Sequence, residues 1–366
     1  MPQGRGGIKG GCDWVKITMV RGEGKRQRTV AVQNTSRYSF APFSLMHGFA
    51  FTKLGGWRGI AGVKIFVTGA TGFLGAHFVR QLGSEDVQMG LLMREGGNRW
   101  RLEPLPGNAV VMEGSLEALP EEKIKEFEPD VVVHAAWHGV TNQHRNDAAQ
   151  IGENLLPTVK LVELAREVGC KTFVGLGSQA EYGPLNRKIS ESDSTEPSTL
   201  YGATKLAACH LTRQLCAQAG MRWAWLRVFS TYGPMEDLSW MVPYLIRSLL
   251  KRERPKLTAG EQRWDYLFAT DAAEAIWSVV KTPGAAGVFN LGSGRADLLR
   301  TVVETLRDAI DPRLPLGIGE VPYRPDQVMH LEADVARLTA ATGWTPKVSL
   351  EEGMRRTVKW HRAYVK

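Results

Sequence analysis

The stretch VKIFVTGATGFLGAHFV, at residues 63–79, joins an apolar run to a helical pattern through three glycines. Glycines at these spacings permit a tight turn, a close backbone approach to a pyrophosphate and close packing of the helix. The helix N-terminus also favours negative charge. A strand before the glycines and a helix after them favour a dinucleotide site over a structural turn. We expect cofactor contacts at Gly69, Thr71, Gly72, Phe73, Leu74 and Gly75.

Beyond this stretch, apolar runs alternate with helical patterns. The apolar runs lie at 63–69, 87–93, 109–113, 130–136, 171–177 and 222–228. Helical patterns separate several of them, including a long one at 154–168 and one that begins at Tyr201. Strands that are apolar throughout are typical of a parallel sheet covered on both faces. We therefore predict an α/β protein with a Rossmann, doubly wound parallel sheet.

The second half of the chain is less regular. We expect helices near 242–250, from Asp271, from Leu298 and after Pro346. The run GVFNLG at 287–292 has the pattern of a strand that returns to the first sheet. This predicts a dinucleotide-binding domain over 63–235 that includes the returning strand. Residues 236–366 are then mainly a smaller, interleaved C-terminal α/β substrate domain.

Residues 1–62 differ from the rest in charge. They contain ten basic and two acidic residues, which accounts for the formal charge of +8, and the remaining 36 basic and 36 acidic residues balance. A neutral enzyme portion has no electrostatic footprint for nucleic acid. We expect 1–62 to be a basic, disordered extension or a segment added by a start site placed too early. A targeting segment and a nucleic-acid-binding arm are the alternatives.

The spacing of the cysteines and the length of the hydrophobic runs indicate in which cellular compartment the protein lies. The four cysteines, at positions 12, 170, 209 and 216, show neither a Cys-x-x-Cys motif nor the spacing of metal ligands. Neither a disulfide framework nor a zinc site is suggested. The sequence has no apolar run of about eighteen residues and no secretory signal pattern. We expect a soluble, cytoplasmic protein without a membrane partner.

The end of the second apolar run bears on the choice of cofactor. In NAD-binding folds an acid at this place binds the adenosine ribose hydroxyls, but the sequence there is LLMREGG, with Arg94 in the position of the acid. The planar donor fork of arginine suits a 2′-phosphate. Glu95 follows directly, and a solvated Arg94 at a strand end is the alternative. We predict NADP, with NAD as the alternative.

Three residues further along have the pattern of a proton-transfer site. Tyr201 and Lys205 stand four residues apart, hence on one face of a helix. An adjacent ammonium stabilises a phenolate and lowers the phenol pKa from its reference value of about 10. Ser178 follows the apolar run before them. Beside a dinucleotide site, this pattern predicts that Tyr201 exchanges a proton with a substrate hydroxyl or carbonyl while nicotinamide exchanges hydride.

From Val63 to its C-terminus the sequence resembles the extended short-chain dehydrogenase/reductases, specifically the nucleotide-sugar epimerase/dehydratase branch. Several motifs besides the glycine loop and YGATK carry the likeness. They are HAA at 134–136, ENLLPTVKLVELAREVG at 153–169, RVFSTYGP at 227–234, DYLFATDAAEAI at 265–276, VFNLGSG at 288–294 and GWTPKVSLEEGMRRTVKW at 343–360. The resemblance also implies a homodimer built from the long helices near Asn154 and Tyr201.

The resemblance implies roles for individual residues. Ser178 hydrogen-bonds the reacting sugar oxygen, Tyr201 is the acid/base, and Lys205 holds the nicotinamide ribose and lowers the tyrosine pKa. Further cofactor contacts fall at Ser115 and Leu116, near the adenine, and at Ala135, Ala136, Asn154, Tyr201 and Phe229. Substrate contacts fall at Ser178, Gln179, Ser230, Arg263 and Arg324. Arg324 suits a nucleotide diphosphate because its fork engages phosphate oxygens; a loop arginine before proline is the alternative.

Some positions depart from the family pattern. Ser230 stands where many relatives have Asn, and Trp264 stands where several have a phosphate-binding Arg, with Arg263 one place earlier. The substrate contacts thus follow the pattern less closely than the cofactor contacts do. The three histidines at 134, 138 and 144 lack matching acids or cysteines. We expect no metal site and take His134 to be a structural residue at a strand end.

Three reactions share this scaffold: reduction of a keto-sugar with NADPH, epimerisation through a keto intermediate with retained NAD, and 4,6-dehydration. Dehydratases of the family carry an Asp-Glu pair directly after the Ser or Thr, because removal of water needs an additional acid and base. Here those positions hold Gln179 and Ala180, which disfavours dehydration. Glu181 comes one residue too late and, by strand alternation, should point to the other face.

Arg94 favours reduction over epimerisation, since epimerases of this branch generally retain NAD and bind its ribose through an acid. We therefore predict an NAD(P)-dependent oxidoreductase, 4-ketoreductase-like, that reduces a nucleoside-diphosphate 4-keto-6-deoxy sugar with Tyr201 as proton donor. A nucleoside-diphosphate-sugar 4-epimerase with bound NAD is the alternative. A catalytically silent nucleotide-binding protein is a third reading, against which the intact Ser178, Tyr201 and Lys205 argue.

Overall fold

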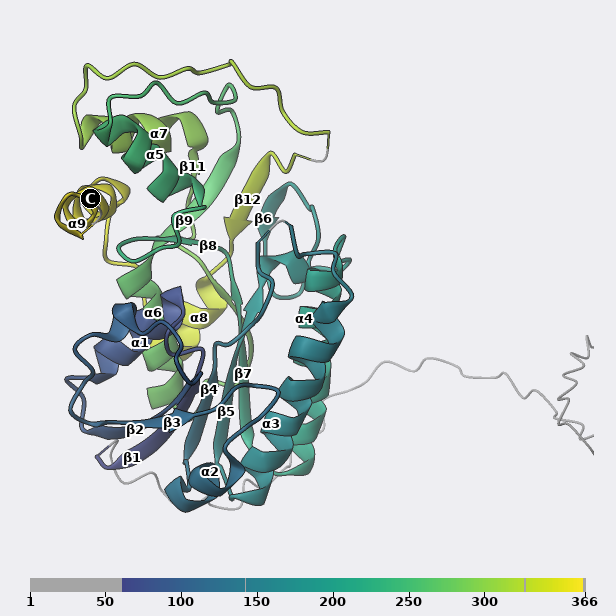
Figure 1. Ribbon diagram of the computed structural model, residues 1–366. Helices are drawn as coiled ribbons and strands as arrows, with labels where there is room; N and C mark the ends of the chain where they lie inside the picture. Colours follow the sequence, from purple (N-terminus) through teal and green to yellow (C-terminus); the bar gives the residue numbers. More distant parts are fainter. Residues whose placement is uncertain (1–60, 142, 326, 365–366) are drawn as a thin grey trace, which may run out of the picture. The chain divides into compact units, whose positions relative to one another are not determined.

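Two sheets organise the chain in the computed structural model, which describes residues 61–141, 143–325 and 327–364. The larger sheet has the strand order β10-β7-β5-β4-β1-β2-β3, and all its pairings are parallel (Figure 1). Its strands are β1 (Val63–Thr68), β2 (Val87–Met93), β3 (Ala109–Glu113), β4 (Val131–His134), β5 (Thr172–Ser178), β7 (Arg222–Val228) and β10 (Gly287–Leu291). The predicted Rossmann sheet is confirmed. The expectation for 1–62 concerns residues that, apart from 61 and 62, lie outside the described ones.

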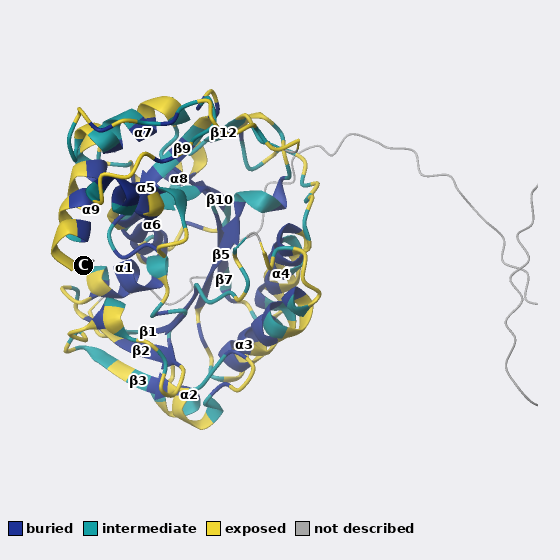
Figure 2. Cartoon of the chain, turned by 45° about the horizontal axis from the view of Figure 1, so that its top comes forward, coloured by how far each residue is buried: buried dark blue, intermediate teal, exposed yellow. Residues whose placement is uncertain are grey.

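Helices cover both faces of the larger sheet, as Figure 1 shows. One face carries α1 (Phe73–Leu82), α6 (Ala269–Lys281) and α8 (Ala336–Thr342). The other carries α2 (Glu121–Phe127), α3 (Leu156–Glu167) and α4 (Leu200–Gln218). Because both faces are covered, central strands are buried along their length, and every residue of β5 is buried (Figure 2). This explains the continuous apolar runs in the sequence.

The smaller sheet has the order β11-β9-β12-β6, and β8 pairs with β9. Its strands are β6 (Arg187–Ile189), β8 (Ser230–Tyr232), β9 (Arg263–Phe268), β11 (Ala296–Leu298) and β12 (His330–Ala333). A separate apolar core joins it to α5 (Met241–Leu250), α7 (Leu299–Asp308) and α9 (Leu350–Tyr364). The sequence did not reveal β6, β8, β11, β12, α2 or α8, because such short segments carry too little periodicity.

The chain passes repeatedly between the two sheets. Strand β10 lies parallel to β7 at the edge of the larger sheet although it follows β9 of the smaller one. Conversely, β6 belongs to the smaller sheet although it precedes β7. A division of the chain at residue 235 remains a prediction, since α6, β10 and α8 all follow that residue and pack in the larger layer.

The carboxyl ends of β1, β4 and β5 lie at one edge of the larger sheet, because these strands are parallel neighbours. Gly69, Ala135 and Gln179 follow these three ends. Ligands of open α/β sheets bind at this edge, which is where the motif residues of the sequence converge.

Two further features are the character of the helices and the state of the cysteine residues. Among the described residues, none of the helices combines the length and the apolar character that crossing a membrane requires. Cys170, Cys209 and Cys216 are free thiols in the interior, where burial raises the pKa of each to about 12.

Candidate active site

The glycine-rich loop lies between β1 and α1. Gly69 has φ +70°, which L side chains rarely adopt, and a Cβ there would lie 2.5 Å from the backbone nitrogen of Ala136. A Cβ on Gly75 would overlap the carbonyl oxygen of Gly69. Gly72 is the N-cap of α1, and no side chain caps this helix. The helix start is thus suited to bind phosphate through backbone N–H groups.

A cavity of about 230 Å³ opens beside this loop. It is lined by eight of the predicted cofactor residues, namely Gly69, Thr71, Gly72, Arg94, Ser115, Leu116, Ala135 and Ala136. It is also lined by residues that the sequence did not suggest, namely Leu92, Gly114, Glu117, Trp137, His138 and Glu153. The predicted residues outside its lining are Phe73, Leu74, Gly75, Asn154, Tyr201, Lys205 and Phe229. The cavity therefore extends from the glycine loop toward the ends of β2 and β3, where adenosine lies in Rossmann folds.

A second cavity, of about 250 Å³, lies at the end of β2. Its lining consists of Thr71, Gly72, Met93, Arg94, Gly97, Asn98, Arg99 and Arg101. Arg99 pairs with Glu113, with 2.9 Å between Nη2 and Oε1. Arg101, in the 3₁₀ turn η1 (Trp100–Leu102), donates from Nη1 to the carbonyl oxygen of Thr71 at 3.2 Å. The sequence pointed only to Arg94, whereas the fold brings three arginine residues to the lining of one cavity.

Ser178 ends β5 and begins the 3₁₀ turn η3 (Gln179–Glu181). Its Oγ accepts a hydrogen bond from the backbone N–H of Ala180 at 3.2 Å. Its own backbone N–H donates to Oε1 of Glu181 at 2.8 Å. These two bonds form a capping box, which fixes the backbone that carries the serine hydroxyl.

Tyr201 lies in the first turn of α4. This helix is capped by Thr199, whose Oγ1 accepts from the backbone N–H of Gly202 at 3.1 Å. Tyr201 is 7% exposed, and its burial raises the pKa of the phenol. The nearby Ser178 hydroxyl and the charge of Arg145 oppose that rise in the pKa of Tyr201. The fold therefore brings the predicted serine and tyrosine together, 23 positions apart in sequence.

Lys205 lies one turn further along α4 and is 4% exposed. Its Nζ donates to the carbonyl oxygen of Leu176 in β5 at 2.6 Å and lies 3.7 Å from the ring centroid of Trp137. Burial lowers the pKa of this ammonium to about 7, and the charge of Glu181 opposes the decrease. Lys205 was expected to lower the pKa of Tyr201. This role stays a prediction; the influences that oppose the effect of burial on the pKa of Tyr201 are the Ser178 hydroxyl and the charge of Arg145.

Asn154 lies in a π-helical turn, η2 (Ile151–Leu155), directly before α3. Its Oδ1 accepts from the backbone N–H of His138 at 2.6 Å, and its Nδ2 donates to the carbonyl oxygen of His138 at 3.2 Å. Nδ2 also donates to Oε1 of Gln150 at 3.1 Å. Asn154 thus holds the backbone of the loop that follows β4 and borders the cofactor cavity, rather than lining that cavity itself.

Glu181 was expected to point to the opposite face of the strand, and its position in the structure has a different cause. Strand alternation does not extend to this residue, because β5 ends at Ser178 and the chain turns as η3. Glu181 is fully buried and forms an ion pair with Arg227, with 2.7 Å between Oε2 and Nε. Trp225 Nε1 donates to Oε1 at 2.9 Å. Its carboxylate is therefore held inside the protein by three donors.

His134 is a buried residue at the end of β4. Its Nδ1 lies 2.8 Å from Oγ1 of Thr68, and its Nε2 lies 2.9 Å from Oγ1 of Thr158. Burial lowers the pKa of the imidazole to about 3. His134 is therefore neutral at physiological pH and ties two neighbouring elements together. Within the described ranges, no group of three or more His, Cys, Asp or Glu side chains could hold a metal ion.

The predicted substrate residues are divided between the end of β5, which carries Ser178 and Gln179, and the region of the smaller sheet. Ser230 begins β8, and Arg263, which is exposed, begins β9. The backbone N–H of Arg263 donates to the carbonyl oxygen of Met329 at 2.8 Å, so the segment that follows the exposed Arg324 runs beside β9. Phe229 is 5% exposed and belongs to a small apolar cluster of this sheet. No described contact joins Arg263 to Ser178.

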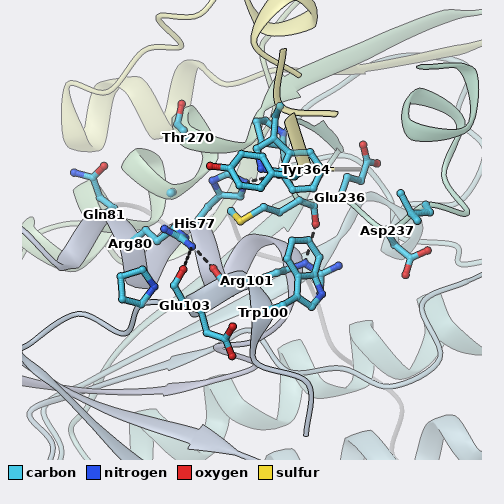
Figure 3. A pocket seen from close by; sticks show the side chains of 16 residues that line it. His77, Arg80, Gln81, Trp100, Arg101, Glu103, Glu236, Asp237, Thr270 and Tyr364 are labelled. Carbon is cyan, nitrogen blue, oxygen red and sulfur yellow. Dashed lines mark hydrogen bonds between the residues drawn. The ribbon is translucent and has the colours of Figure 1, made fainter. Parts of the chain in front are cut away.

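A third cavity, of about 1220 Å³, is lined by residues of α1, η1, α6, α9 and 234–238, and its lining does not include Ser178, Tyr201 or Lys205. Figure 3 shows Trp100, Arg101 and Tyr364 among the side chains around it. Arg101 donates from Nε to the carbonyl oxygen of Met235 at 2.7 Å and also binds Thr71. This residue therefore connects the cavity to the glycine loop. Nothing in the sequence pattern indicated it.

Comparisons with known proteins agree with this geometry. The profile of the NAD dependent epimerase/dehydratase family matches residues 65–292. The dTDP-glucose 4,6-dehydratase of Xanthomonas campestris pv. campestris is 27% identical over 322 residues, which cover 81% of this chain and 92% of that protein. The dTDP-glucose 4,6-dehydratase 1 of Escherichia coli K12 is 26% identical over 339 residues, with 83% and 94% covered.

Solved structures show the same architecture. UDP-glucose 4-epimerase of Thermus thermophilus, in complex with NAD, has a TM-score of 0.73 and 26% identity over 83% of this chain and 100% of that one. UDP-N-acetylglucosamine 4-epimerase of Methanobrevibacter ruminantium M1 has a TM-score of 0.77, with 83% and 99% covered, and at 24% identity it shows the fold alone. The family profile spans more than half of the chain. This protein belongs to the NAD-dependent epimerase/dehydratase family, the nucleotide-sugar branch of the extended short-chain dehydrogenase/reductases.

Proposed function

We propose that this protein reduces a keto group of a nucleoside-diphosphate 4-keto-6-deoxy sugar, with NADPH as hydride donor and Tyr201 as proton donor. The observation that carries the proposal is that the Ser178 hydroxyl lies near enough to the Tyr201 phenol to lower its pKa. This proximity brings two hydroxyl groups together at the sheet edge that also carries the glycine loop. Hydride and proton transfer require no other acid or base.

The residues present fit a nicotinamide dinucleotide. Gly69 and Gly75 allow the tight loop that leads into α1, and no side chain caps the start of this helix at Gly72, so its backbone N–H groups suit a pyrophosphate. Ala135, Ala136 and His138 border the same cavity. When bound, the reduced nicotinamide supplies the hydride.

Tyr201 donates its phenolic proton to the oxygen of the keto group, and the carbonyl becomes a secondary alcohol. Burial raises the pKa of this phenol, so Tyr201 is protonated at neutral pH, as a proton donor must be. Ser178 donates a hydrogen bond to the same oxygen and stabilises its developing charge. The ammonium of Lys205 stabilises the resulting phenolate, which then regains a proton from solvent.

The cavity at the end of β2 supports NADP over NAD. Arg94, Arg99 and Arg101 line it together with Thr71 of the glycine loop. A 2′-phosphate carries two negative charges near neutral pH and suits the planar donor forks of arginine. Arg94 stands where NAD-binding folds place an acid for the ribose hydroxyls.

The turn after Ser178 supports simple reduction over dehydration. Gln179 and Ala180 cannot exchange the protons that loss of water requires. Glu181 has its carboxylate bound to Arg227 and Trp225 and is fully buried. The dehydratase relatives, at 26–27% identity, therefore do not determine the reaction of this chain.

A nucleoside-diphosphate-sugar 4-epimerase with retained NAD is the second candidate. The likeness to UDP-glucose 4-epimerase of Thermus thermophilus, solved with NAD, favours it. Reduction and epimerisation share the same serine, tyrosine and lysine. They differ in whether the coenzyme is consumed.

We also propose that the smaller sheet binds the nucleotide and that two copies of the chain associate. Arg263 and Arg324 are exposed cations of this sheet region and suit a diphosphate. Exposed leucines on the two long helices support a homodimer through α3 and α4. Leu156 is 61% exposed and Leu211 is 44% exposed.

The test uses purified protein and three sets of substrates: nucleoside-diphosphate 4-keto-6-deoxy sugars with NADPH or NADH in stoichiometric excess, and nucleoside-diphosphate 4-epimeric sugars and nucleotide glucose with NAD. Coenzyme absorbance and product composition are followed together. Oxidation of NADPH in proportion to alcohol formed supports the reductase. Interconversion of 4-epimeric sugars without net coenzyme oxidation supports the epimerase instead. Release of water to give a 4-keto-6-deoxy product from a nucleotide glucose would contradict both.

A further inference from the structure

The carboxylate of Glu181 is buried against the backbone of the last two residues of β5, Gly177 and Ser178. The residue is 0% exposed. Oε1 accepts hydrogen bonds from the backbone N–H of Ser178 at 2.8 Å and from Nε1 of Trp225 at 2.9 Å. Oε2 accepts one from Nε of Arg227 at 2.7 Å. Three donors from two strands therefore hold this carboxylate in one orientation.

The ion pair between Glu181 and Arg227 is buried on both sides, with side chains that are 0% and 5% exposed. The guanidinium of Arg227 also lies over the ring of Tyr182, 4.3 Å from its centroid. Burying two charges carries a large desolvation penalty, and well-packed apolar residues of similar volume are often at least as stabilising. Stability of the fold alone therefore does not explain a charged pair here.

The carboxylate packs against the strand that binds Lys205. A Cβ on Gly177 would overlap Oε1 of Glu181, so the carboxylate lies on the backbone of Gly177. The preceding residue, Leu176, accepts the hydrogen bond from Nζ of Lys205 at 2.6 Å. Negative carboxylate and positive ammonium therefore contact adjacent residues of β5.

The turn that carries Glu181 also contacts the helix that carries the lysine. A Cβ on Gly202 would overlap the carbonyl oxygen of Ala180. Gly202 directly follows Tyr201 in the first turn of α4. The turn η3 therefore packs directly against the first turn of α4, next to Tyr201. A displacement of η3 would change the position of Ser178 relative to Tyr201.

We infer that Glu181 is a positioning residue of this site. Its buried carboxylate fixes the turn that presents Ser178 and places a negative charge near the ammonium of Lys205. The inference deepens the proposed function and rests on it for its catalytic consequence. Its electrostatic part concerns the resting protein and can be measured without a substrate.

The other groups that face Lys205 do not supply this charge. His134 of β4 has its pKa lowered to about 3 by burial and is neutral. Tyr201, on the same helix, has its pKa raised by burial and is neutral as well. Trp137, in the loop after β4, offers the face of its ring at 3.7 Å, which attracts a cation without carrying a net charge.

Two cations contact neighbours of Lys205. Arg227 is bound to the carboxylate of Glu181, and Arg145 lies 5.3 Å from the ring centroid of Tyr201. Burial lowers the pKa of Lys205, and the charge of Glu181 opposes that effect. Removing the carboxylate should therefore make Lys205 lose its proton at lower pH.

The direct test is the titration of Lys205, followed by NMR in protein labelled with ¹³C at the ε-carbon of lysine. Loss of one signal in Lys205→Arg assigns the resonance. We expect Glu181→Gln to lower the titration midpoint by about one pH unit, a tenfold loss of proton affinity. Glu191→Gln is the matched control. It removes a partly buried carboxylate that binds the backbone N–H of Asn290 and should leave the midpoint unchanged.

A second variant guards against misfolding, because Glu181→Gln leaves Arg227 buried without its counterion. The double variant Glu181→Gln/Arg227→Gln removes both charges and retains amide groups for hydrogen bonding. It should lower the Lys205 midpoint in the same direction. A midpoint within about 0.3 pH unit of the wild type in either folded variant overturns the inference.

The pH profile of turnover separates this inference from the proposed function. If the wild type reduces a keto-sugar, the basic limb of kcat/KM should move to lower pH in Glu181→Gln. An equal fractional loss of activity at every pH, with an unmoved NMR midpoint, would indicate a purely structural role. A wild type that turns over no sugar overturns the proposed function, and the NMR titration still decides the role of Glu181.

Discussion

The ammonium of Lys205 donates a hydrogen bond to the carbonyl oxygen of Leu176 at 2.6 Å. This contact fastens α4 to β5, so the helix that carries Tyr201 meets the strand end that carries Ser178. It also removes a charged group from water. Burial lowers the pKa of Lys205 to about 7 from an ordinary value of 10.5.

The buried lysine should make stability depend on pH. Between pH 7 and 10.5 the unfolded chain binds a proton at Lys205 that the folded chain does not, so the free energy of unfolding rises with pH across this window. Lys205→Met removes that contribution. We expect the melting temperature of Lys205→Met, relative to the wild type, to be higher at about pH 6.5 than at about pH 9.

Differential scanning calorimetry of both proteins at the two pH values measures this difference. Lys171→Met is a suitable control, because Lys171 is exposed and pairs with Asp130 at the surface. A difference in melting temperature that is the same at both pH values would contradict a lowered pKa for Lys205.

Arg94 should discriminate between the two coenzymes. A charged hydrogen bond to a phosphate contributes about 1.5–3 kcal/mol, or about a tenfold to hundredfold change in affinity. We expect Arg94→Ala to raise the KM for NADPH by about tenfold, because Arg94 is exposed, and to change the KM for NADH little. Arg166→Ala, an exposed change on α3, is the control. Equal preference for the two coenzymes in wild type and variant would refute the assignment to NADP.

Tyr201 and Ser178 should affect turnover more than binding. Loss of a positioned proton donor costs about 10²–10⁴-fold in rate. We expect Tyr201→Phe to lower kcat by about a hundredfold or more and Ser178→Ala to lower it by a smaller factor. The dissociation constant of NADPH, measured by fluorescence, should remain within about twofold in both variants, because neither hydroxyl belongs to the glycine loop. Unimpaired turnover in Tyr201→Phe would exclude this residue as the proton donor.

The exposed leucines of the long helices should determine the oligomeric state. Charged residues in the core of an interface disrupt association, because they are buried without partners. We expect Leu156→Glu and Leu211→Glu to convert a dimer to a monomer in sedimentation or size-exclusion experiments with light scattering. Val110→Glu, at a 56% exposed position on β3, should leave the dimer intact. A wild type that is monomeric at micromolar concentration would contradict the proposal.

The strands of the larger sheet could be predicted along the chain, because each depends on a local apolar pattern. The runs at 87–93 and 109–113 coincide with β2 and β3. The glycine loop could be placed for the same reason: spacing of three residues and a following helix are local properties. Short elements such as β6 escaped prediction, because three residues form a strand only when β12 lies beside them.

The placement of Glu181 shows where sequence reasoning reaches its limit. The sequence shows that Glu181 stands one residue beyond the two positions at which dehydratases carry their Asp-Glu pair. Its partners, Trp225 and Arg227, lie more than forty residues further along the chain and could not be identified from the sequence. The cavity at the end of β2 also depends on contacts between residues that are distant in the sequence. Arg94 stood out by its place after a strand, whereas Arg101 joins it only because η1 folds back against Thr71.

The sequence by itself determined the Rossmann sheet, the dinucleotide loop, the candidate serine, tyrosine and lysine, and the absence of acids at 179 and 180, since each depends on residues close together in the chain. Only the tertiary structure decided which groups surround them. It buried Lys205 against Trp137, turned Glu181 inward to Arg227, and gathered arginines at one cavity. Burial and long-range contacts set charge and pKa, and neither is a property of a local pattern.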